Sequence, residues 1–219
     1  MKNIGKSIKK INLKNMTINI AGVVGVGKSS LCNIFSELGY KVYHEPVFDN
    51  ELLEKFYADK QKYAFPLQIF FLNKRFEMYK DSVKHNMSIM DRSIVEDRIF
   101  AKMLRDQKEL TQKEYDIYVE LFNNMMEHVH PPTIMVYLRI KTDNVIERIK
   151  KRGREYELDQ DPKYWHDLNY NYEIFFNEYT WSKLLVIDVD DIDFVNKEKD
   201  RKYIIETIKD SLKVPQIKY

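Results

Sequence analysis

One segment of the chain has the composition and spacing of a phosphate-binding loop: Gly22-Val23-Val24-Gly25-Val26-Gly27-Lys28-Ser29. Glycines let a backbone curve closely around phosphate groups with several N–H groups pointing inward, and a helix that begins there adds partial positive charge. Lys28 can reach the outer phosphates, and the Ser29 hydroxyl can ligate Mg²⁺. The flanking residues fit a strand before the loop and a helix after it, as a P-loop requires. We therefore predict that ATP or another nucleoside triphosphate binds, with Mg²⁺, to Gly22, Gly25, Gly27, Lys28, Ser29 and Ser30.

Charged residues also follow two other predicted strands. Glu45 comes after a strand expected at 41–44, and Pro46 ends that strand. Asp91 and Arg92 follow a short strand at 88–90. In open α/β sheets ligands bind beyond the carboxyl ends of the strands. A carboxylate and a guanidinium are therefore expected beside the phosphate loop.

A strongly apolar helix is predicted from about residue 65 to 83, with a buried stripe of Phe65, Ile69, Leu72 and Phe76. Gln68 and Arg75 lie close to the same face, with the aromatic Phe71 between them. Buried polar groups need partners, so these residues could present a flat hydrogen-bonding edge to a nucleobase. An equally good interpretation of the pattern alone is a core glutamine with a surface arginine.

A positive cluster lies at the end of a helix predicted from 142 to 151, which Thr142 and Asp143 are expected to cap. Arg148, Arg152 and Arg154 surround Gly153, and Glu157 follows. The planar forks of arginine suit phosphate oxygens. A glycine hinge inside a cationic segment is the layout of a mobile lid.

The remaining segments alternate between strand and helix patterns. Strands are expected at 18–21, 133–138 and 184–189, and helices at 31–38, 49–60, 94–104, 111–129, 162–179 and 198–213. The helix at 111 has a capping-box pattern, Thr111 with Glu114. Such alternation indicates an α/β fold: a five-stranded parallel sheet with helices on both faces and an arginine-rich lid. Residues 1–15 are expected to be a flexible basic tail, and residues 16–219 a single domain.

Charge and cysteine content limit the partners of the chain. The net charge is +2 from 36 basic and 34 acidic residues, which gives no support for a nucleic-acid or membrane surface. No apolar run approaches the roughly 20 residues of a membrane helix. A single cysteine excludes an internal disulfide and favours a reducing, cytoplasmic location.

The chain resembles the deoxyribonucleoside kinases, in the branch that holds the deoxyadenosine, deoxyguanosine and deoxycytidine kinases. The resemblance covers residues 17 to 213 and rests on motifs in order: the P-loop, Glu45-Pro46-Val47, Tyr57, Gln68 with Arg75, Asp91-Arg92-Ser93 with Asp97 and Phe100, and 148–157. It implies a P-loop kinase fold and ATP-dependent phosphorylation of a deoxynucleoside 5′-hydroxyl. It also implies a homodimer, expected through the aromatic-rich helices around Phe70 and Tyr118.

The resemblance implies a role for each matching residue. Glu45 looks like the base that accepts the proton of the 5′-hydroxyl, and Arg92 looks like the arginine that orients the Glu45 carboxylate. Lys28 is expected to supply positive charge to the phosphates. Nucleoside contacts are implied for Tyr57 and Glu157 at the 3′-hydroxyl, for Gln68, Arg75 and Asp97 at the base, and for Phe71 and Phe100 as apolar rings beside it. Arg148, Arg152 and Arg154 fall in the lid.

Two departures from the animal members suggest the bacterial side of the family. Phe48-Asp49-Asn50 stands where an arginine-tryptophan pair is usual, and Asp91 replaces a glutamate. The residues expected at the base favour a purine or cytosine over thymine. We expect deoxyadenosine first, with deoxyguanosine or deoxycytidine also possible. Two alternatives stay open: a nucleoside monophosphate kinase such as thymidylate kinase, and a P-loop switch or ATPase without a metabolite substrate.

Overall fold

A computed structural model describes residues 16–46 and 51–213 of the chain. The predicted tail at 1–15 and the segment Val47 to Asn50 lie outside the described residues. Five strands form one sheet in the order β2-β3-β1-β4-β5, and every neighbouring pair is parallel. The strands are β1 (Met16–Ala21), β2 (Lys41–Tyr43), β3 (Met87–Asp91), β4 (Ile134–Arg139) and β5 (Leu184–Asp188). The predicted five-stranded parallel sheet is confirmed.

The central strands are buried on both faces, which explains their continuous apolar sequences. In β4 every residue except Arg139 is buried, and β1 is buried at all positions except Thr17. The register of the sheet also determines which candidate site segments lie next to each other. Ile20 of β1 pairs with Asp91 of β3, so the phosphate loop and the Asp91 segment emerge side by side. The carboxyl ends of three neighbouring strands thus meet at one edge.

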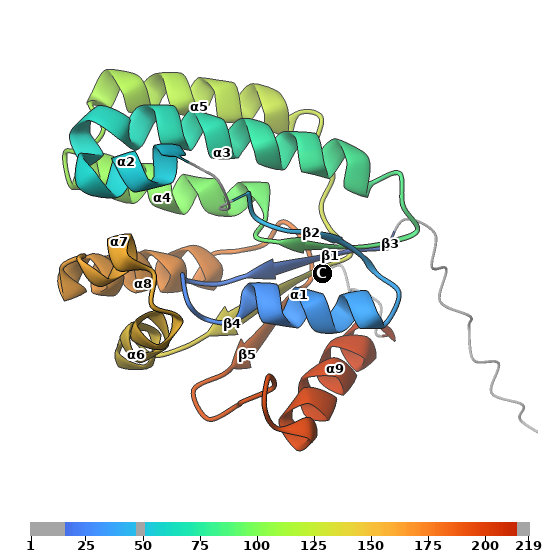
Figure 1. The fold of residues 1–219 in the computed structure, drawn as a ribbon. Helices are drawn as coiled ribbons and strands as arrows, with labels where there is room; N and C mark the ends of the chain where they lie inside the picture. Colours follow the sequence, from blue (N-terminus) through green and yellow to red (C-terminus); the bar gives the residue numbers. More distant parts are fainter. Residues whose placement is uncertain (1–15, 47–50, 214–219) are drawn as a thin grey trace, which may run out of the picture.

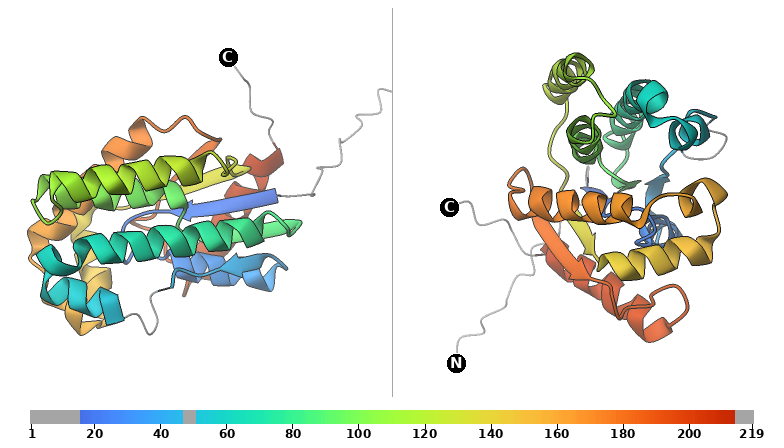
Figure 2. Two further views of the ribbon diagram at one scale, coloured as in Figure 1. Left: turned by 90° about the horizontal axis from the view of Figure 1, so that it is seen from above. Right: turned by 90° about the vertical axis from the view of Figure 1, so that its left-hand side faces the viewer.

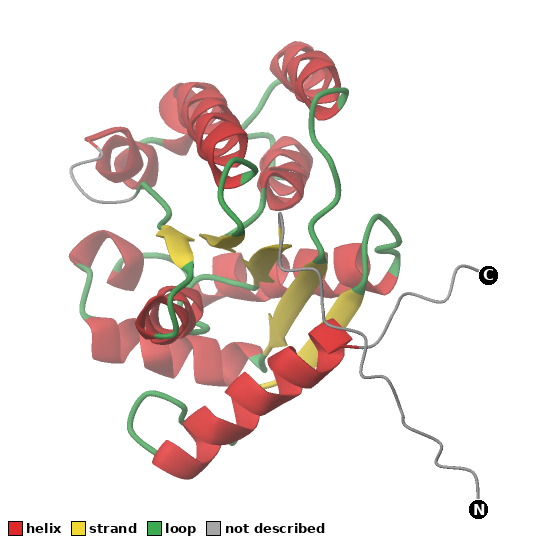
Figure 3. Cartoon of the chain, turned by 90° about the vertical axis from the view of Figure 1, so that its right-hand side faces the viewer, coloured by secondary structure: helices red, strands yellow, loops and turns green. Residues whose placement is uncertain are grey.

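Helices cover both faces of the sheet (Figures 1 and 3). On one side lie α2 (Glu51–Ala58), α3 (Lys60–Ser82), α4 (Asp97–Asp106) and α5 (Gln112–Met126), and on the other lie α1 (Lys28–Glu37) and α9 (Glu198–Lys213). Seen from above, α3, α4 and α5 run side by side (Figure 2). The carboxyl edge of the sheet is flanked by α6 (Thr142–Arg152), α7 (Glu155–Leu158) and α8 (Pro162–Asn177). Among the described residues, no helix has the length and apolar character needed to cross a membrane.

The predicted apolar stripe of α3 is confirmed only at Leu72, which is fully buried. Phe65, Ile69 and Phe76 are only partly buried, whereas Gln68 and Arg75 are 3% and 1% exposed. The helix is apolar on several sides because it touches α2, α4 and α5, so periodicity did not identify its inward face. The helix also begins five residues earlier than expected. Its cap is the carboxylate of Asp59, which accepts the Lys62 N–H at 3.1 Å.

Smaller differences concern the ends of helices. The helix expected at 94–104 is divided into a 3₁₀ turn, η1 (Ile94–Glu96), and α4. The Thr111 capping box is confirmed, although α5 ends at Met126, three residues before the expected end. Thr142 is the first residue of α6 rather than its cap, because Lys141 occupies the cap position without a side-chain bond. The other helices agree with expectation to within a few residues.

Tyr118 marks one of the two helices expected to form a homodimer, and its own side chain faces the interior of the chain. Tyr118 of α5 is fully buried within the chain, where its ring stacks on Phe122 with the centroids 6.3 Å apart. The side of α5 that carries Tyr118 packs against α3 and α4. Tyr118 therefore belongs to the core of the protomer, whereas Ile117 of the same helix is exposed, and a homodimer through these helices stays a prediction.

Candidate active site

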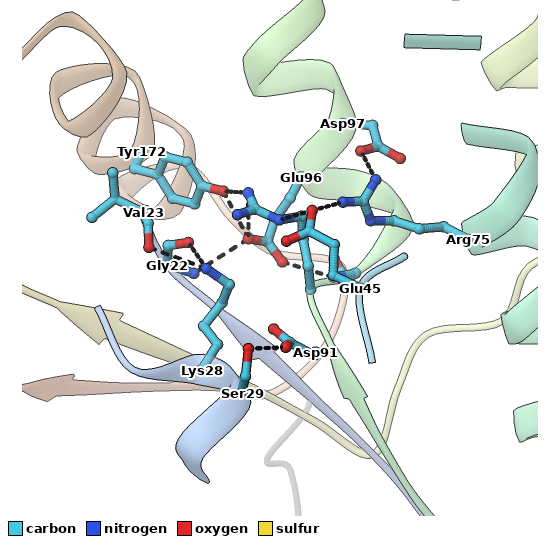
Figure 4. Close-up of polar contacts among 12 residues, drawn as sticks. Gly22, Val23, Lys28, Ser29, Glu45, Arg75, Asp91, Glu96, Asp97 and Tyr172 are labelled. Atoms are coloured by element: carbon cyan, nitrogen blue, oxygen red, sulfur yellow. Dashed lines mark hydrogen bonds and ion pairs between the residues drawn. The ribbon is translucent and has the colours of Figure 1, made fainter. Parts of the chain in front are cut away.

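The phosphate loop joins β1 to α1 and leaves the start of that helix open. Gly27 holds the cap position with a left-handed φ of 107°, and no side chain caps the helix. The first N–H groups of α1 are thus free to face an anion. The Lys28 ammonium donates to the carbonyls of Gly22 and Val23 at 2.9 and 3.1 Å (Figure 4). Burial, together with the nearby charge of Arg92, lowers the pKa of Lys28 to about 8.

Gly22 lies beneath the loop rather than inside the cavity, and its surroundings leave no room for a side chain. A Cβ atom there would be 2.8 Å from the Leu138 carbonyl oxygen, and its φ of 145° is strained for other residues. The N–H of Gly22 donates to Glu96 Oε2 at 3.2 Å. Gly22 therefore fixes the backbone position at which the loop begins after β1.

Gly22→Ala is expected to lower stability by about 1–3 kcal/mol and to raise the KM for ATP severalfold, because the backbone of the loop must shift. Gly39→Ala is the matched control. Gly39 also has a positive φ, 89°, but a Cβ there would meet nothing within 4 Å. Thermal unfolding and ATP titrations of both variants check the prediction. An equal change of KM in the two variants would contradict it.

The residues beside Ser29 fit a magnesium ion. Ser29 Oγ donates to Asp91 Oδ2 at 2.5 Å, and the other oxygen of this buried carboxylate has no hydrogen-bond partner among the described residues. Magnesium takes oxygen ligands and is commonly held by one or two protein groups with substrate phosphates. The described part of the chain has no cluster of three or more acidic, His or Cys side chains for a metal held by protein alone.

Glu45 lies between two arginines at the centre of the site. Arg92 Nε is 2.9 Å from Glu45 Oε1, and Arg75 pairs with the same oxygen through Nη2. Burial would raise the pKa of Glu45, but the charges of Arg92 and Arg75 outweigh it and hold the pKa at about 2. The carboxylate is therefore ionised across the physiological range. Arg92 is held in this place by a left-handed backbone, with a φ of 74°.

The predicted site residues converge on one cavity of about 460 Å³. All of them except Gly22 line it: Gly25, Gly27, Lys28, Ser29, Ser30, Glu45, Tyr57, Gln68, Phe71, Arg75, Arg92, Asp97, Phe100, Arg148, Arg152, Arg154 and Glu157. They come from the connections after β1, β2 and β3, from the start of α1, from α2, α3 and α4, and from the segment 148–157. The cavity thus runs from the phosphate loop to the inner face of α3.

Unpartnered polar groups lie at the far end of this cavity. Gln68 is 3% exposed and makes no side-chain hydrogen bond to any described residue. Asp97 Oδ1 accepts from Arg75 Nη1 at 2.5 Å, while Oδ2 has no partner among the described residues. Burial raises the pKa of Asp97 to about 7, against the opposing charge of Arg75. Buried groups of this kind are expected to hydrogen-bond to a ligand. Arg75 is confirmed as a buried residue, not a surface arginine.

The lid arginines are engaged by residues of the protein itself. Arg152 donates to Glu157 Oε2, and Arg154 Nη1 is 3.4 Å from Glu157 Oε1. Arg148 donates to the carbonyls of Val26 and Val189 at 2.9 and 2.7 Å. It therefore ties the phosphate loop to the end of β5.

The sequence profile of the deoxynucleoside kinase family matches residues 18–213 of this chain. The chain belongs to the deoxynucleoside kinase family. It is 41% identical to the deoxyguanosine kinase of Lactobacillus acidophilus over 206 residues, which is 90% of each chain. It is 36% identical to the deoxyadenosine/deoxycytidine kinase of Bacillus subtilis over 200 residues, 89% of this chain and 92% of the relative.

Solved structures of deoxynucleoside kinases share this fold. The deoxyadenosine kinase from M. mycoides with dCMP and a flexible dCDP bound superposes with a TM-score of 0.80 at 34% identity. The match covers 89% of this chain and all of that one. The expected P-loop kinase fold is thus confirmed, and deoxynucleoside phosphorylation is selected over the monophosphate kinase and the switch.

Sequence reasoning missed several residues of this kinase. Glu96 and Tyr172 are buried beside Arg92, and Tyr164 lines the cavity. Ser93 and Glu96 form a capping box with the same spacing as Thr111 and Glu114, so this pattern could have found Glu96. No local signal brings Tyr172 to Arg92 from 80 residues away.

A second cavity of about 580 Å³ was also missed. It lies on the other side of the phosphate loop and shares Gly25, Gly27, Ser30, Arg148 and Arg152 with the first. Its other residues are Lys151 and the segment 190–197 after β5. The 190–197 loop contains no recognisable motif, so its sequence gives no sign that it lines a cavity.

Proposed function

We propose that this kinase transfers the γ-phosphoryl group of ATP to the 5′-hydroxyl of a purine deoxynucleoside, with Glu45 as the general base. The observation that carries the proposal is the position of Glu45. Its carboxylate pairs with Arg92 at 2.9 Å and lies in the same cavity as Lys28 and Ser29 on one side and Gln68 on the other. A hydroxyl held there would face the phosphate loop.

Glu45 accepts the proton of the 5′-hydroxyl as the new O–P bond forms, since a sugar hydroxyl is not ionised beforehand. Arg92 holds the carboxylate in place and stabilises charge on the transferring group. Lys28 exchanges its two backbone carbonyls for phosphate oxygens when ATP binds. Mg²⁺ held by Ser29 and Asp91 would neutralise phosphate charge. Phosphoryl transfer depends mainly on such positioning and electrostatic stabilisation.

The nucleoside contacts follow from the cavity. Tyr57 and Glu157 line its sugar end, where they would bind the 3′-hydroxyl. Tyr57 is itself fixed by stacking on Tyr156 of the lid, with ring centroids 5.3 Å apart. Glu157 exchanges its arginine partners for the sugar, so Arg152 and Arg154 become available to phosphates. Phe71 and Phe100 lie beside the base.

The donor nucleotide would extend through the phosphate loop into the second cavity, whose Asp190 to Lys197 segment offers polar groups to a base and ribose. The M. mycoides enzyme, solved with dATP and with dCTP bound, supports binding of a nucleoside triphosphate. The donor nucleotide and the acceptor deoxynucleoside would then lie on opposite sides of Lys28 and Gly27.

The base is proposed to be a purine because the relatives are named for deoxyguanosine and for deoxyadenosine with deoxycytidine. The free oxygen of Asp97 suits the N–H donors of guanine, whereas the Gln68 amide can pair with the donor and acceptor of adenine. The expected preference for deoxyadenosine, the homodimer and the cytoplasmic location stay predictions.

The direct test is phosphorylation of the four deoxynucleosides and their four monophosphates by the purified protein, with ATP and with or without Mg²⁺. Purine deoxynucleosides are expected to be the best acceptors, and omission of Mg²⁺ to abolish turnover. Preference for monophosphates, or for thymidine, would refute the proposal. Comparing deoxyguanosine with deoxyadenosine in the same assay ranks the two bases.

Asp97→Asn is expected to change the ratio of kcat/KM between deoxyguanosine and deoxyadenosine by about tenfold or more, because a site group paired with the wrong base edge is left unsatisfied. The KM for ATP is expected to stay within about twofold, since Asp97 faces α3 and not the phosphate loop. Arg75 is a poorer choice because it also contacts Glu45.

Asp81→Asn is the control for Asp97→Asn. Asp81 accepts a hydrogen bond from Tyr43 at 2.7 Å and lines neither cavity. Its substitution should leave the base ratio unchanged. An unchanged ratio in Asp97→Asn as well would remove Asp97 from the base pocket.

A further inference from the structure

Glu96 touches both halves of the site although the reaction above gives it no role. Its side chain is fully buried. Oε1 accepts the Ser93 N–H at 2.7 Å, and Oε2 accepts the Gly22 N–H at 3.2 Å and the Tyr172 O–H at 3.0 Å (Figure 4). The same Oε2 is 3.9 Å from Arg92 Nη1. One carboxylate therefore joins the phosphate loop, the Arg92 segment and α8.

Local structure alone does not require a charge at this position. Capping boxes accept glutamine as well as glutamate at the third position, so the cap of η1 needs only one oxygen. A fully buried carboxylate is costly unless it is paired and hydrogen-bonded. Both Glu96 oxygens accept bonds, from three donors on three segments, and the nearest cation is Arg92. The negative charge of Glu96 therefore serves Arg92 and the phosphate loop, whereas the cap of η1 would need only a neutral oxygen.

Arg92 lies between two carboxylates. Glu45 is 2.9 Å from its Nε on one side, and Glu96 is 3.9 Å from its Nη1 on the other. Tyr172 links Arg92 to Glu96, because its hydroxyl accepts from Arg92 Nη1 and donates to Glu96 Oε2. The Gly22 N–H and Arg92 Nη1 approach the same Glu96 oxygen, so a shift of the loop amide would alter the hydrogen bonding of the carboxylate beside Arg92. The guanidinium that contacts Glu45 is thus connected to the backbone of the phosphate loop by a single carboxylate.

We propose that Glu96 is a positioning residue that couples occupation of the phosphate loop to the placement of Arg92 against Glu45, so that bound ATP tightens deoxynucleoside binding. The proposal rests on the proposed function, which assigns the loop to ATP and Arg92 to the acceptor. Coupling of this kind is reciprocal, so the deoxynucleoside tightens ATP binding by the same factor.

The test is calorimetric titration of deoxyguanosine or deoxyadenosine, whichever is the better acceptor, with and without a saturating non-hydrolysable ATP analogue and Mg²⁺. In the wild-type kinase the analogue is expected to tighten binding by about fivefold or more, the lower end of typical coupling. In Glu96→Gln the two dissociation constants should agree within about twofold, and kcat should fall by about tenfold or more.

Glu173→Gln is the matched control for this experiment. Glu173 follows Tyr172 on α8 and accepts a hydrogen bond from Tyr137 at 2.6 Å, but it lines neither cavity. Both variants lose one carboxylate that accepts from a tyrosine. Coupling and kcat should be unchanged in Glu173→Gln, so a general effect of removing a carboxylate that accepts from a tyrosine would be recognised.

Tyr172→Phe keeps the proposal testable if Glu96→Gln does not fold. It removes only the hydroxyl between Arg92 and Glu96, while the ring keeps its stacking on Tyr137 and Phe176. Coupling is expected to decrease in the same direction. Coupling of wild-type size in whichever of the two variants folds overturns the positioning role, and so does a wild-type kinase without coupling. A protein that phosphorylates no deoxynucleoside would refute the proposed function itself.

Discussion

Glu45→Gln is expected to lower kcat by about 10²- to 10⁴-fold, the usual contribution of a general base, while the deoxynucleoside still binds. The amide keeps the size of the side chain but cannot accept the proton of the 5′-hydroxyl. The fold should survive, because Arg92 keeps Glu96 and Arg75 keeps Asp97 as partners. Steady-state kinetics and calorimetric titration of the deoxynucleoside measure the two effects separately.

Glu45→Asp provides the comparison, since it retains a carboxylate in a shifted position and should keep more activity than the amide. The pH dependence gives a second check. With a pKa held at about 2, Glu45 is ionised at pH 5 as well as at pH 8, so its protonation removes no activity in that range. Wild-type turnover in Glu45→Gln would show that another group takes the proton.

Arg92→Lys is expected to lower kcat by about 10²- to 10³-fold, because an ammonium replaces a planar fork that makes several directed contacts. Arg92 pairs with Glu45 through Nε and donates to Tyr172 through Nη1. Lysine keeps the charge between Glu45 and Glu96, so the change in melting temperature should be small. Alanine would remove the cation beside the buried Glu96 and leave Glu45 with Arg75 alone, so effects on stability would be confused with effects on catalysis.

Arg139→Lys is a control for the exchange of arginine by lysine. Arg139 forms a two-pronged pair with Asp188, at 2.5 and 2.8 Å, but it is exposed and lines neither cavity. Its kcat should match the wild type. If Arg92→Lys also matched it, charge alone would suffice at position 92 and the geometry of the fork would be irrelevant.

Motifs at strand ends made most of the site predictable. Gly27, Lys28 and Glu45 were found because a loop at the carboxyl end of a parallel strand faces the ligand, whatever the packing elsewhere. The sheet followed from continuous apolar runs such as that of β4. The structure brings these residues to one cavity.

Tertiary packing decided what the sequence left open. Periodicity predicted an inward stripe through Phe65 and Phe76, but α3 is covered on several sides and its most buried face carries Gln68 and Arg75. Contacts between residues far apart in the sequence, such as that of Tyr172 with Arg92, produce no recognisable sequence pattern. Arg75 and Asp97 were both expected at the base, but the ion pair between Arg75 and Glu45 depends on how β2 and α3 meet.

The placement of the site residues has an evolutionary consequence. The residues proposed to bind phosphate lie in the loop after β1 and in the segment 148–154, whereas those proposed to face the base lie on α3 and α4. Substitutions on those two helices can therefore alter the choice of base while phosphoryl transfer is preserved. Such separation lets a duplicated gene acquire a new substrate in a few steps, which fits a family whose relatives are named for different deoxynucleosides.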